Sequence, residues 1–182
     1  MNRKKITVYC GSRLGNDPIY ASFAGRLGEA IGKNGYDLIY GGGSIGLMGI
    51  VADAAMASGA VVTGYMPQAL IDREMAHLGI SRLVPVSSMA ERKELLILGG
   101  DAFVVLPGGI GTMEELFDTL SVHHLSPHPE GAAPILLANA GHIYDPLKVL
   151  WENMVQNGFI PSEERNLIRI CDTPEEMIPF WP

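Results

Sequence analysis

Short apolar runs alternate along this chain with longer segments of helical periodicity, and this alternation limits its fold more than any other feature. Six runs are nearly continuous in apolar residues: 6–10, 37–40, 61–65, 83–86, 102–106 and 134–138. Such runs predict strands that are buried on both faces. Segments with helical spacing lie between and after them: 18–34, 46–58, 89–98, 112–125, 145–157 and a short 174–180. The pattern predicts an α/β protein with a single domain over residues 1–182, a Rossmann-like three-layer fold with a mostly parallel sheet.

Glycine is enriched, and its positions matter more than its number. Ten of the 22 glycines fall in three strand-to-helix loops: Gly11, Gly15, Gly41, Gly42, Gly43, Gly46, Gly49, Gly108, Gly109 and Gly111. The chain is 47% hydrophobic and its glycines follow no three-residue period, which excludes a disordered or collagen-like chain. Ligands of an open parallel sheet bind beyond the carboxyl ends of the strands, where these loops lie. We therefore expect a pocket built largely from backbone.

Charge and cysteine content narrow the partners. The net charge of −7 gives no long-range attraction for DNA or RNA, so we expect no nucleic-acid partner. The run 6–10 is shorter than the apolar core of a signal peptide, and no run approaches the roughly 18 residues of a membrane span, so we expect no membrane partner. Cys10 and Cys171 form no CxxC pair, which indicates a reducing, cytoplasmic setting without metal or redox chemistry.

The first glycine loop, 41–46, follows a predicted strand and opens a predicted helix. Its sequence GGGSIG satisfies GxGxxG, the pattern of dinucleotide-binding loops. A dinucleotide fold also needs an acidic residue at the end of the next strand, and the segment 64–68 carries none. Two interpretations stay open: these glycines serve a nucleotide, or they allow tight turns and close helix–strand packing.

The second glycine loop, 107–112, lies between the strand 102–106 and the next helix. Its three glycines let a ligand approach the backbone, and the free N–H groups of the first helical turn point at whatever occupies the loop. This pattern predicts an anion site of phosphate size. The loop lacks the Gly-Lys-Ser/Thr ending of a P-loop, so a triphosphate with magnesium is not expected.

Charged pairs open two of the predicted helices. Glu114 and Glu115 follow the second glycine loop, and Thr112 with Glu115 has the T-x-x-E spacing of a capping box, so Glu115 is either a helix cap or a functional acid. Two acids beside a phosphate site would repel the phosphate unless they serve another part of the substrate. Arg92 and Lys93 lie near the start of another helix, where a bound anion would compensate their unfavourable position in the helix dipole. The alternative is a solvated helix start.

Together these motifs resemble the Lonely Guy (LOG) family of cytokinin riboside 5'-monophosphate phosphoribohydrolases, often labelled lysine decarboxylases. The resemblance runs through VYCGS at 8–12, YGGG at 40–43, GLMG at 46–49, ERK at 91–93, PGGIGTMEE at 107–115 and GFI at 158–160. It implies hydrolysis of the N-glycosidic bond of a purine nucleoside 5'-monophosphate, AMP or a cytokinin riboside monophosphate, to free base and ribose 5-phosphate. It also implies a homodimer and no metal or redox cofactor.

The resemblance assigns roles to particular residues. It implies that Arg92 and Glu115 are the catalytic pair. An N-glycosidic bond breaks through an oxocarbenium-like state, which a carboxylate near C1' stabilises, whereas an arginine cannot act as an acid at neutral pH and would orient substrate or stabilise charge. The resemblance places the following residues at the nucleotide: Gly11, Ser12, Gly42, Gly43, Glu74, Lys93, Gly108, Gly109, Ile110, Gly111, Thr112, Met113, Glu114 and Ser121.

The chain also departs from the family pattern, mostly away from the phosphate loop. Arg13 stands where serine is usual, Ala90 replaces a common histidine, and Val122 and His124 replace tryptophan and glutamine. The loop 126–134 is longer than the family norm. These departures affect base preference and the subunit interface, so plain AMP stays open beside prenylated nucleotides.

Three other functions compete with hydrolysis. His123, His124 and His128 suggest a metal, but Pro127 is expected to end the helix and no acidic or cysteine ligand is clustered there. Pyridoxal phosphate chemistry would need a Schiff-base lysine, for which only Lys93 is suitable. A non-catalytic nucleotide-binding or carrier protein would keep the loop, but has no need of both Arg92 and Glu115.

Overall fold

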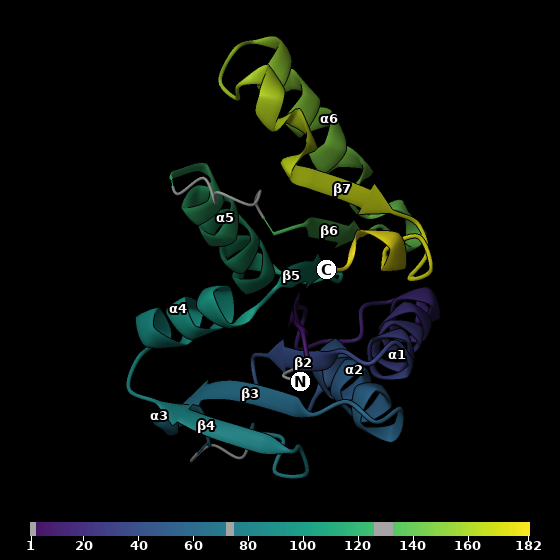
Figure 1. Ribbon diagram of the computed structural model, residues 1–182, viewed down its shortest axis with the longest axis vertical. Coiled ribbons are helices and arrows are strands. Elements are labelled where there is room, and N and C mark those ends of the chain that lie inside the picture. Colours follow the sequence, from purple (N-terminus) through teal and green to yellow (C-terminus); the bar gives the residue numbers. More distant parts are fainter. Residues whose placement is uncertain (1–2, 72–74, 126–132) are drawn as a thin grey trace.

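A single sheet of seven parallel strands forms the centre of the molecule (Figure 1). The computed structural model describes residues 3–71, 75–125 and 133–182. The strand order is β4-β3-β2-β1-β5-β6-β7. The strands are β1 (Lys5–Tyr9), β2 (Asp37–Tyr40), β3 (Val62–Pro67), β4 (Arg82–Val86), β5 (Ala102–Val105), β6 (Ile135–Ala138) and β7 (Ile168–Cys171). The predicted α/β fold with a parallel sheet is confirmed.

Helices cover both faces of this sheet, as Figure 1 shows for α1 and α2 on one side and α4 and α5 on the other. The α-helices are α1 (Pro18–Lys33), α2 (Gly46–Ala57), α3 (Gln68–Ile71), α4 (Met89–Gly99), α5 (Ile110–Leu125) and α6 (Asp145–Gln156). Three short 3-10 helices follow β6, α6 and β7: η1 (Ala140–His142), η2 (Ser162–Leu167) and η3 (Ile178–Phe180). None of the helices in the described ranges has the length and apolar content to cross a bilayer.

Two hydrophobic clusters fill the space on either side of the sheet. One joins α1 and α2 to alternate residues of the central strands, such as Ile6 and Val8, and takes in Trp181 near the C-terminus. The other joins α4, α5 and α6 to the opposite residues, such as Phe103 and Val105. Because successive side chains of a strand point to opposite faces, continuously apolar strands feed both clusters.

The edges of the sheet differ from expectation. The sequence did not predict β7, in which the exposed Arg169 interrupts the apolar run. The prediction that every strand is buried on both faces is wrong for β4, an edge strand with only Val86 fully buried. At the C-terminus, the helical pattern 174–180 forms only the three-residue η3. In each case an edge or end has a neighbour on one side only, so local sequence pattern is a weaker guide there.

The point where the strand order reverses determines where a ligand can bind. From β1 the chain continues to β2, which pairs with one side of β1, and β5 pairs with the other side. The loops that follow β1 and β5 therefore lie side by side, and Gly11 N donates to Pro107 O at 3.1 Å. Ligands of doubly wound folds bind in the crevice at such a switch point.

Candidate active site

A cavity of about 670 Å³ opens at this switch point. The loop after β1 and the loop between β5 and α5 form its walls, and side chains from α2 and α4 complete it. Nine of the residues that the sequence assigned to the site line this cavity: Gly11, Ser12, Arg92, Gly108, Gly109, Ile110, Gly111, Thr112 and Glu115. The structure thus brings the second glycine loop, Arg92 and Glu115 around one space.

The N-terminus of α5 presents its backbone to the cavity. The helix begins at Ile110, two residues earlier than predicted, so Gly109 and Gly111 flank its first residue. A Cβ atom built on either glycine would have no neighbour within 4 Å, which means that open space lies beside both. Exposed N–H groups of a first helical turn, with the helix dipole behind them, favour an anion.

The early start of α5 changes the interpretation of Glu115. Thr112 is the third residue of the helix, and its buried side chain packs against the Cα of Gly108. Of the two alternatives for Glu115, the capping box with Thr112 is therefore wrong, because a capping threonine must precede the helix. Glu115 lies in the second turn with its side chain available to the cavity.

Glu115 is a carboxyl group in a mostly dry environment. Its side chain is 13% exposed, and burial raises its pKa from 4.5 to about 7, while the Arg92 guanidinium acts against this rise. The distance from Arg92 Nη2 to Glu115 Oε1 is 3.5 Å. A carboxyl group that titrates near neutral pH can hold or release a proton under physiological conditions, as general acid–base catalysis requires.

Arg92 is held in place before any substrate binds. Its Nε donates to the backbone oxygen of Tyr65, within β3, at 3.1 Å. Its guanidinium lies so close to the Cα of Gly41 that any side chain there would collide with it. At the start of α4, Ser88 Oγ accepts a hydrogen bond from Glu91 N at 3.1 Å and caps the helix. Arg92 is thus a fixed cation directed at Glu115.

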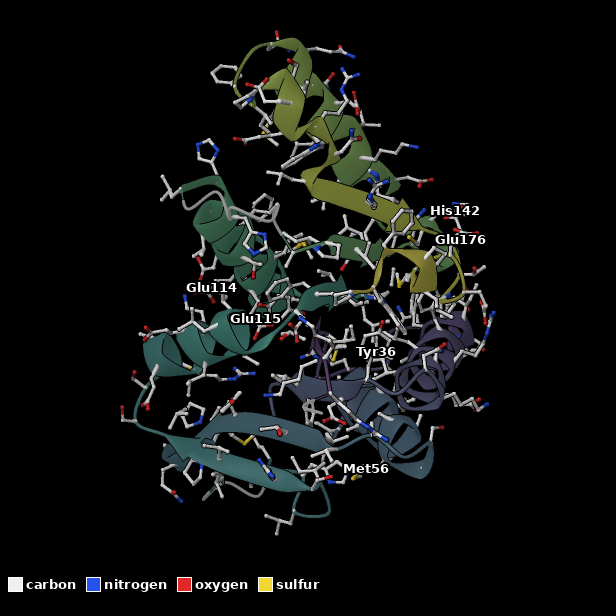
Figure 2. All side chains as sticks on the ribbon, viewed as in Figure 1. Tyr36, Met56, Glu114, Glu115, His142 and Glu176 are labelled. Carbon is white, nitrogen blue, oxygen red and sulfur yellow. The ribbon has the colours of Figure 1, made fainter. Side chains whose placement is uncertain are left out.

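Lys93 and Glu114 lie together, but outside the cavity lining. Lys93 Nζ contacts Glu114 Oε1 at 2.9 Å and Asp118 Oδ2 at 2.7 Å, and these hydrogen bonds raise the lysine pKa. The contacts tie α4 to α5, and Figure 2 shows Glu114 and Glu115 on α5 where the two helices approach each other. Neighbouring acids on one helix therefore have different surroundings: Glu115 faces the cavity and Glu114 faces a lysine.

The first glycine loop packs against residues that line the cavity. Cβ atoms on Gly43 and Gly46 would collide with Met48 and with the backbone of Ser12, respectively. The segment 75–77 covers this loop, with Ser44 N donating to Met75 O at 3.2 Å and His77 N donating to Gly42 O at 2.8 Å. Gly42 and Gly43 do not line the described cavity. Close packing, one of the two open interpretations, accounts for these glycines.

The remaining predicted residues lie elsewhere. Ser121 lines a separate groove of about 230 Å³ between α5 and α6. Met113 is half-buried and packs against the hydrophobic cluster on the α5 face of the sheet. Glu74 falls outside the described residues.

The two predicted histidines that the structure describes, His123 and His124, have separate partners. His123 packs edge-on against Phe103, while His124 Nδ1 contacts Glu164 Oε2 at 2.8 Å. His128 lies outside the described residues. Across the described ranges, no three His, Cys, Asp or Glu side chains are placed to share a metal ion.

The cavity lining also includes Gly15 and Pro107, which lie in the predicted glycine loops, and several residues that the sequence did not assign to the site. These are Cys10, Arg13, Leu14, Tyr20, Leu47, Met48 and Ile143. Arg13 and Leu14 lie between two glycines of the loop after β1, so the loop's place at the sheet edge was a usable signal. Ile143 gave no such signal, because it reaches the cavity from beyond β6.

The cavity therefore has two chemically different parts. Residues Gly109–Gly111 at the start of α5 line it with backbone, and the Arg92–Glu115 pair lines it with charged side chains. The helical rise places Glu115 about 7.5 Å beyond Ile110 along α5, and helical side chains tilt back toward the N-terminus. An anion at the start of α5 would place an attached sugar beside the Glu115 carboxyl group.

Comparisons with known proteins agree on family and fold. A sequence-family model described as "Possible lysine decarboxylase" matches residues 48–179. The cytokinin riboside 5'-monophosphate phosphoribohydrolase of Rhodococcoides fascians is 39% identical over 96% of this chain and 87% of its own. The cytokinin riboside 5'-monophosphate phosphoribohydrolase LOG of Oryza sativa subsp. japonica is 38% identical over 96% of this chain and 71% of its own.

A solved structure shares the fold at lower identity. The molybdenum cofactor binding protein of Rippkaea orientalis superposes with a TM-score of 0.74 over 98% of this chain and 95% of its own, at 20% identity. At that identity the likeness concerns the fold alone.

Proposed function

The chain belongs to the LOG family of cytokinin riboside 5'-monophosphate phosphoribohydrolases, and from this membership we propose that it hydrolyses the N-glycosidic bond of purine nucleoside 5'-monophosphates. The products are the free base and ribose 5-phosphate. The observation that carries the proposal is the position of the Arg92–Glu115 pair in one cavity with the free N–H groups of α5.

The 5'-phosphate would bind at the start of α5. Gly109 and Gly111 leave room for phosphate oxygens to reach the backbone, and the helix dipole favours their negative charge. This anchor fixes the ribose over the second turn of α5. Holding the reacting bond beside a catalytic group lowers the entropic part of the barrier.

Glu115 would act at C1' of the ribose. As the bond to the base breaks, its electron pair leaves with the base and positive charge develops on the sugar, which a nearby carboxylate stabilises. The same carboxylate can accept a proton from the attacking water, whose oxygen forms the new bond to C1'. One water proton ends on the released base, so the reaction balances as addition of water.

Arg92 would orient substrate rather than donate a proton, because a guanidinium stays charged at neutral pH. Its bond to Tyr65 O holds it against the Glu115 carboxyl group. In that position it stabilises the carboxylate form and any negative charge that develops on the departing base. Glu114 is paired with Lys93, so we assign the reacting carboxylate to Glu115.

The assembly that we propose is a homodimer. Apolar side chains are exposed on and near the outer face of α5, among them Phe117, Val122, Leu125 and Phe159. Ser121 lies on this face, so residues that the family pattern assigns to the nucleotide could meet a neighbouring subunit there. Light scattering on the purified protein tests the mass directly.

We also propose a cytoplasmic setting, in line with two buried, free cysteines.

A chromatographic assay tests the activity. The protein is incubated with AMP and, separately, with isopentenyladenosine 5'-monophosphate, and free base is measured. Release of base supports the proposal, and the ratio of the two rates gives the base preference. Tight nucleotide binding without release of base from any purine monophosphate would instead indicate a carrier.

A further inference from the structure

The loop after β1 carries a cation whose backbone is fixed and whose side chain is free. Gly11 N donates to Pro107 O at 3.1 Å, and Leu47 N donates to Gly11 O at 3.2 Å. Gly46, with φ of +64°, packs its Cα against the backbone of Ser12 and Arg13. The loop is therefore held from the β5 side and from the α2 side.

The Arg13 side chain does not share this restraint. It is exposed and lines the cavity, and within the described ranges it forms no ion pair or hydrogen bond. The nearest acid along the chain, Asp17, accepts a hydrogen bond from Ile19 N and caps α1. Arginine carries a permanent charge and five donors in a planar fork, a geometry that suits phosphate oxygens.

The charges that line the cavity make this free cation significant. Only three charged side chains line it among the described residues: Arg13, Arg92 and Glu115. Arg92 lies 3.5 Å from Glu115 and donates to Tyr65 O, so it already has two partners and its direction is fixed. A phosphate dianion entering a chain of net charge −7 would otherwise meet only backbone dipoles.

The position of Arg13 matches the anion site proposed at α5. Strands β1 and β5 are paired neighbours, with Tyr9 opposite Val105, so their loops meet at one edge of the sheet. Arg13 lies two residues beyond Gly11, which contacts the second glycine loop directly. An anion on the N–H groups of Gly109 to Gly111 would lie between the helix N-terminus and this loop.

We propose that Arg13 is a specificity-determining residue that binds the 5'-phosphate and so selects nucleotides over uncharged nucleosides. This inference rests on the proposed function of the same cavity. It gives the two arginines different roles, since Arg92 serves the bond that breaks and Arg13 serves the phosphate. Loss of Arg13 therefore weakens binding of phosphorylated ligands and leaves the chemical step almost unchanged.

Calorimetry with ribose 5-phosphate and with ribose tests the inference without hydrolysis. The variants are Arg13→Ser and Arg13→Lys, and the control is Arg82→Ser, an exposed arginine on the edge strand β4. Hydrogen bonds to charged groups support an expected loss of about 10- to 100-fold in ribose 5-phosphate affinity for Arg13→Ser. Arg13→Lys recovers part of this loss, and ribose binding and the control stay unchanged.

Kinetics of base release give the second readout. For Arg13→Ser we expect KM for the nucleoside monophosphate to rise by about 10- to 100-fold while kcat changes less than about threefold. Unchanged affinity and KM in Arg13→Ser overturn the inference, as does a loss confined to kcat. Equal losses for ribose and ribose 5-phosphate also overturn it, because they indicate a general effect on the cavity.

The calorimetric readout separates this inference from the proposed function. If the wild-type protein releases no base but loses ribose 5-phosphate binding on Arg13→Ser, hydrolysis is wrong and the role of Arg13 stands. If base is released and Arg13→Ser binds ribose 5-phosphate normally, hydrolysis stands and the role of Arg13 is wrong. Thermal unfolding of each variant confirms that the comparison is made between folded proteins.

Discussion

The two glycine-rich loops of this protein have similar sequences and opposite surroundings. Both follow a buried strand and precede a helix, yet Cβ atoms on Gly41, Gly43 and Gly46 would all collide with neighbouring atoms. In the second loop, Gly109 and Gly111 have nothing beside them within 4 Å. Glycine in the first loop makes room for protein, whereas in the second only Gly108 does so, for Thr112, and Gly109 and Gly111 leave open space that a ligand can occupy.

This difference shows how the two loops share one site. The first loop supports groups that act: Gly41 lies under the Arg92 guanidinium, and Gly46 packs beneath the backbone of Arg13. The second loop exposes its own backbone and begins the helix that carries Glu115. Substitutions in the first loop should therefore alter folding, and substitutions in the second should alter activity.

The largest expected effect concerns the helix after the second loop. Glu115→Gln keeps the size of the side chain but removes the carboxylate, so we expect kcat for base release to fall by about 10³- to 10⁴-fold. The matched control is Asp53→Asn in α2, the helix after the first loop, where Asp53 pairs with His77 away from the cavity. Steady-state kinetics should show a near-normal rate for this control.

Near-normal turnover by Glu115→Gln would contradict the difference that we infer between the two loops, because Glu115 on α5 would then not be the reacting group. Glu114→Gln would be measured next, since Glu114 is the adjacent acid and pairs with Lys93. Circular dichroism of each variant confirms that the lost rate does not reflect unfolding.

The second effect is a loss of stability in the first loop. Gly46→Ala places a methyl group against the backbone of Ser12 at a positive φ of +64°, and we expect it to cost about 3 kcal/mol or more in the free energy of unfolding. Gly59→Ala is the control, because Gly59 also has a positive φ, +91°, but open space beside it. We expect Gly59→Ala to lower the free energy of unfolding by about 1 kcal/mol, the cost of the backbone strain alone. Urea unfolding measures both.

If the two alanine variants lose equal stability, the collision at Gly46 does not matter and backbone strain explains both losses. If Gly46→Ala is stable but inactive, the first loop touches the ligand after all. Either result would weaken the distinction between a first loop that packs against protein and a second loop that binds ligand.

The sequence predicted most of the fold because its central strands are apolar throughout. Continuous runs such as 102–106 indicate burial on both faces, and the helical segments between them require a parallel sheet. The sequence failed at the edges: β7 carries the exposed Arg169, and β4 lacks a neighbour on one side. Burial at an edge depends on what lies beside the strand, which local pattern does not contain.

The structure brings predicted site residues together most fully where one continuous segment supplies them. Residues 107–112 and Glu115 line the cavity together, and their place there follows from strand β5 and helix α5 on either side of the loop. The T-x-x-E spacing of Thr112 and Glu115 left a helix cap open as an alternative, because spacing alone does not determine where α5 begins. The surroundings of Arg13 and Ser121 could not be predicted, since they depend on how separate elements pack.

The third effect tests the open space beside the second loop. Gly109→Ala adds a methyl group that meets no protein atom, so the free energy of unfolding should change by less than about 0.5 kcal/mol. The same methyl group would occupy part of the proposed anion site, and we expect kcat/KM to fall about tenfold. Gly25→Ala on α1 is the control, because its methyl group would also fit, 3.8 Å from Ile50, but away from the cavity.

Loss of stability in Gly109→Ala would show that this glycine, like those of the first loop, makes room for protein. Unchanged kcat/KM in a stable Gly109→Ala would place the phosphate elsewhere in the cavity.

The smallest effect is the pH dependence that follows from the burial of Glu115. Its pKa is raised to about 7, so the carboxylate fraction, and with it kcat/KM, should rise about fourfold from pH 6.5 to 8.5 if the carboxylate is the active form. Glu114 contributes to the raised pKa of Glu115, so Glu114→Gln should shift the midpoint to lower pH. A rate that falls over this range would make Glu115 an acid.

Ionisation of Glu115 also destabilises the native state, and this effect gives an independent check on the direction of the pKa shift. The pKa of Glu115 is higher in the native state than the ordinary 4.5 of the unfolded chain, so the native state binds more protons between these values. Glu115 therefore lowers the free energy of unfolding progressively as pH rises from about 4.5 to about 7, and Glu115→Gln removes that decline. Urea unfolding at pH 5 and pH 8 for both proteins measures it. If the free energy of unfolding declines equally in the two proteins, the ionisation belongs to another group. The raised pKa would then no longer distinguish α5, the helix after the second loop, from α2, the helix after the first.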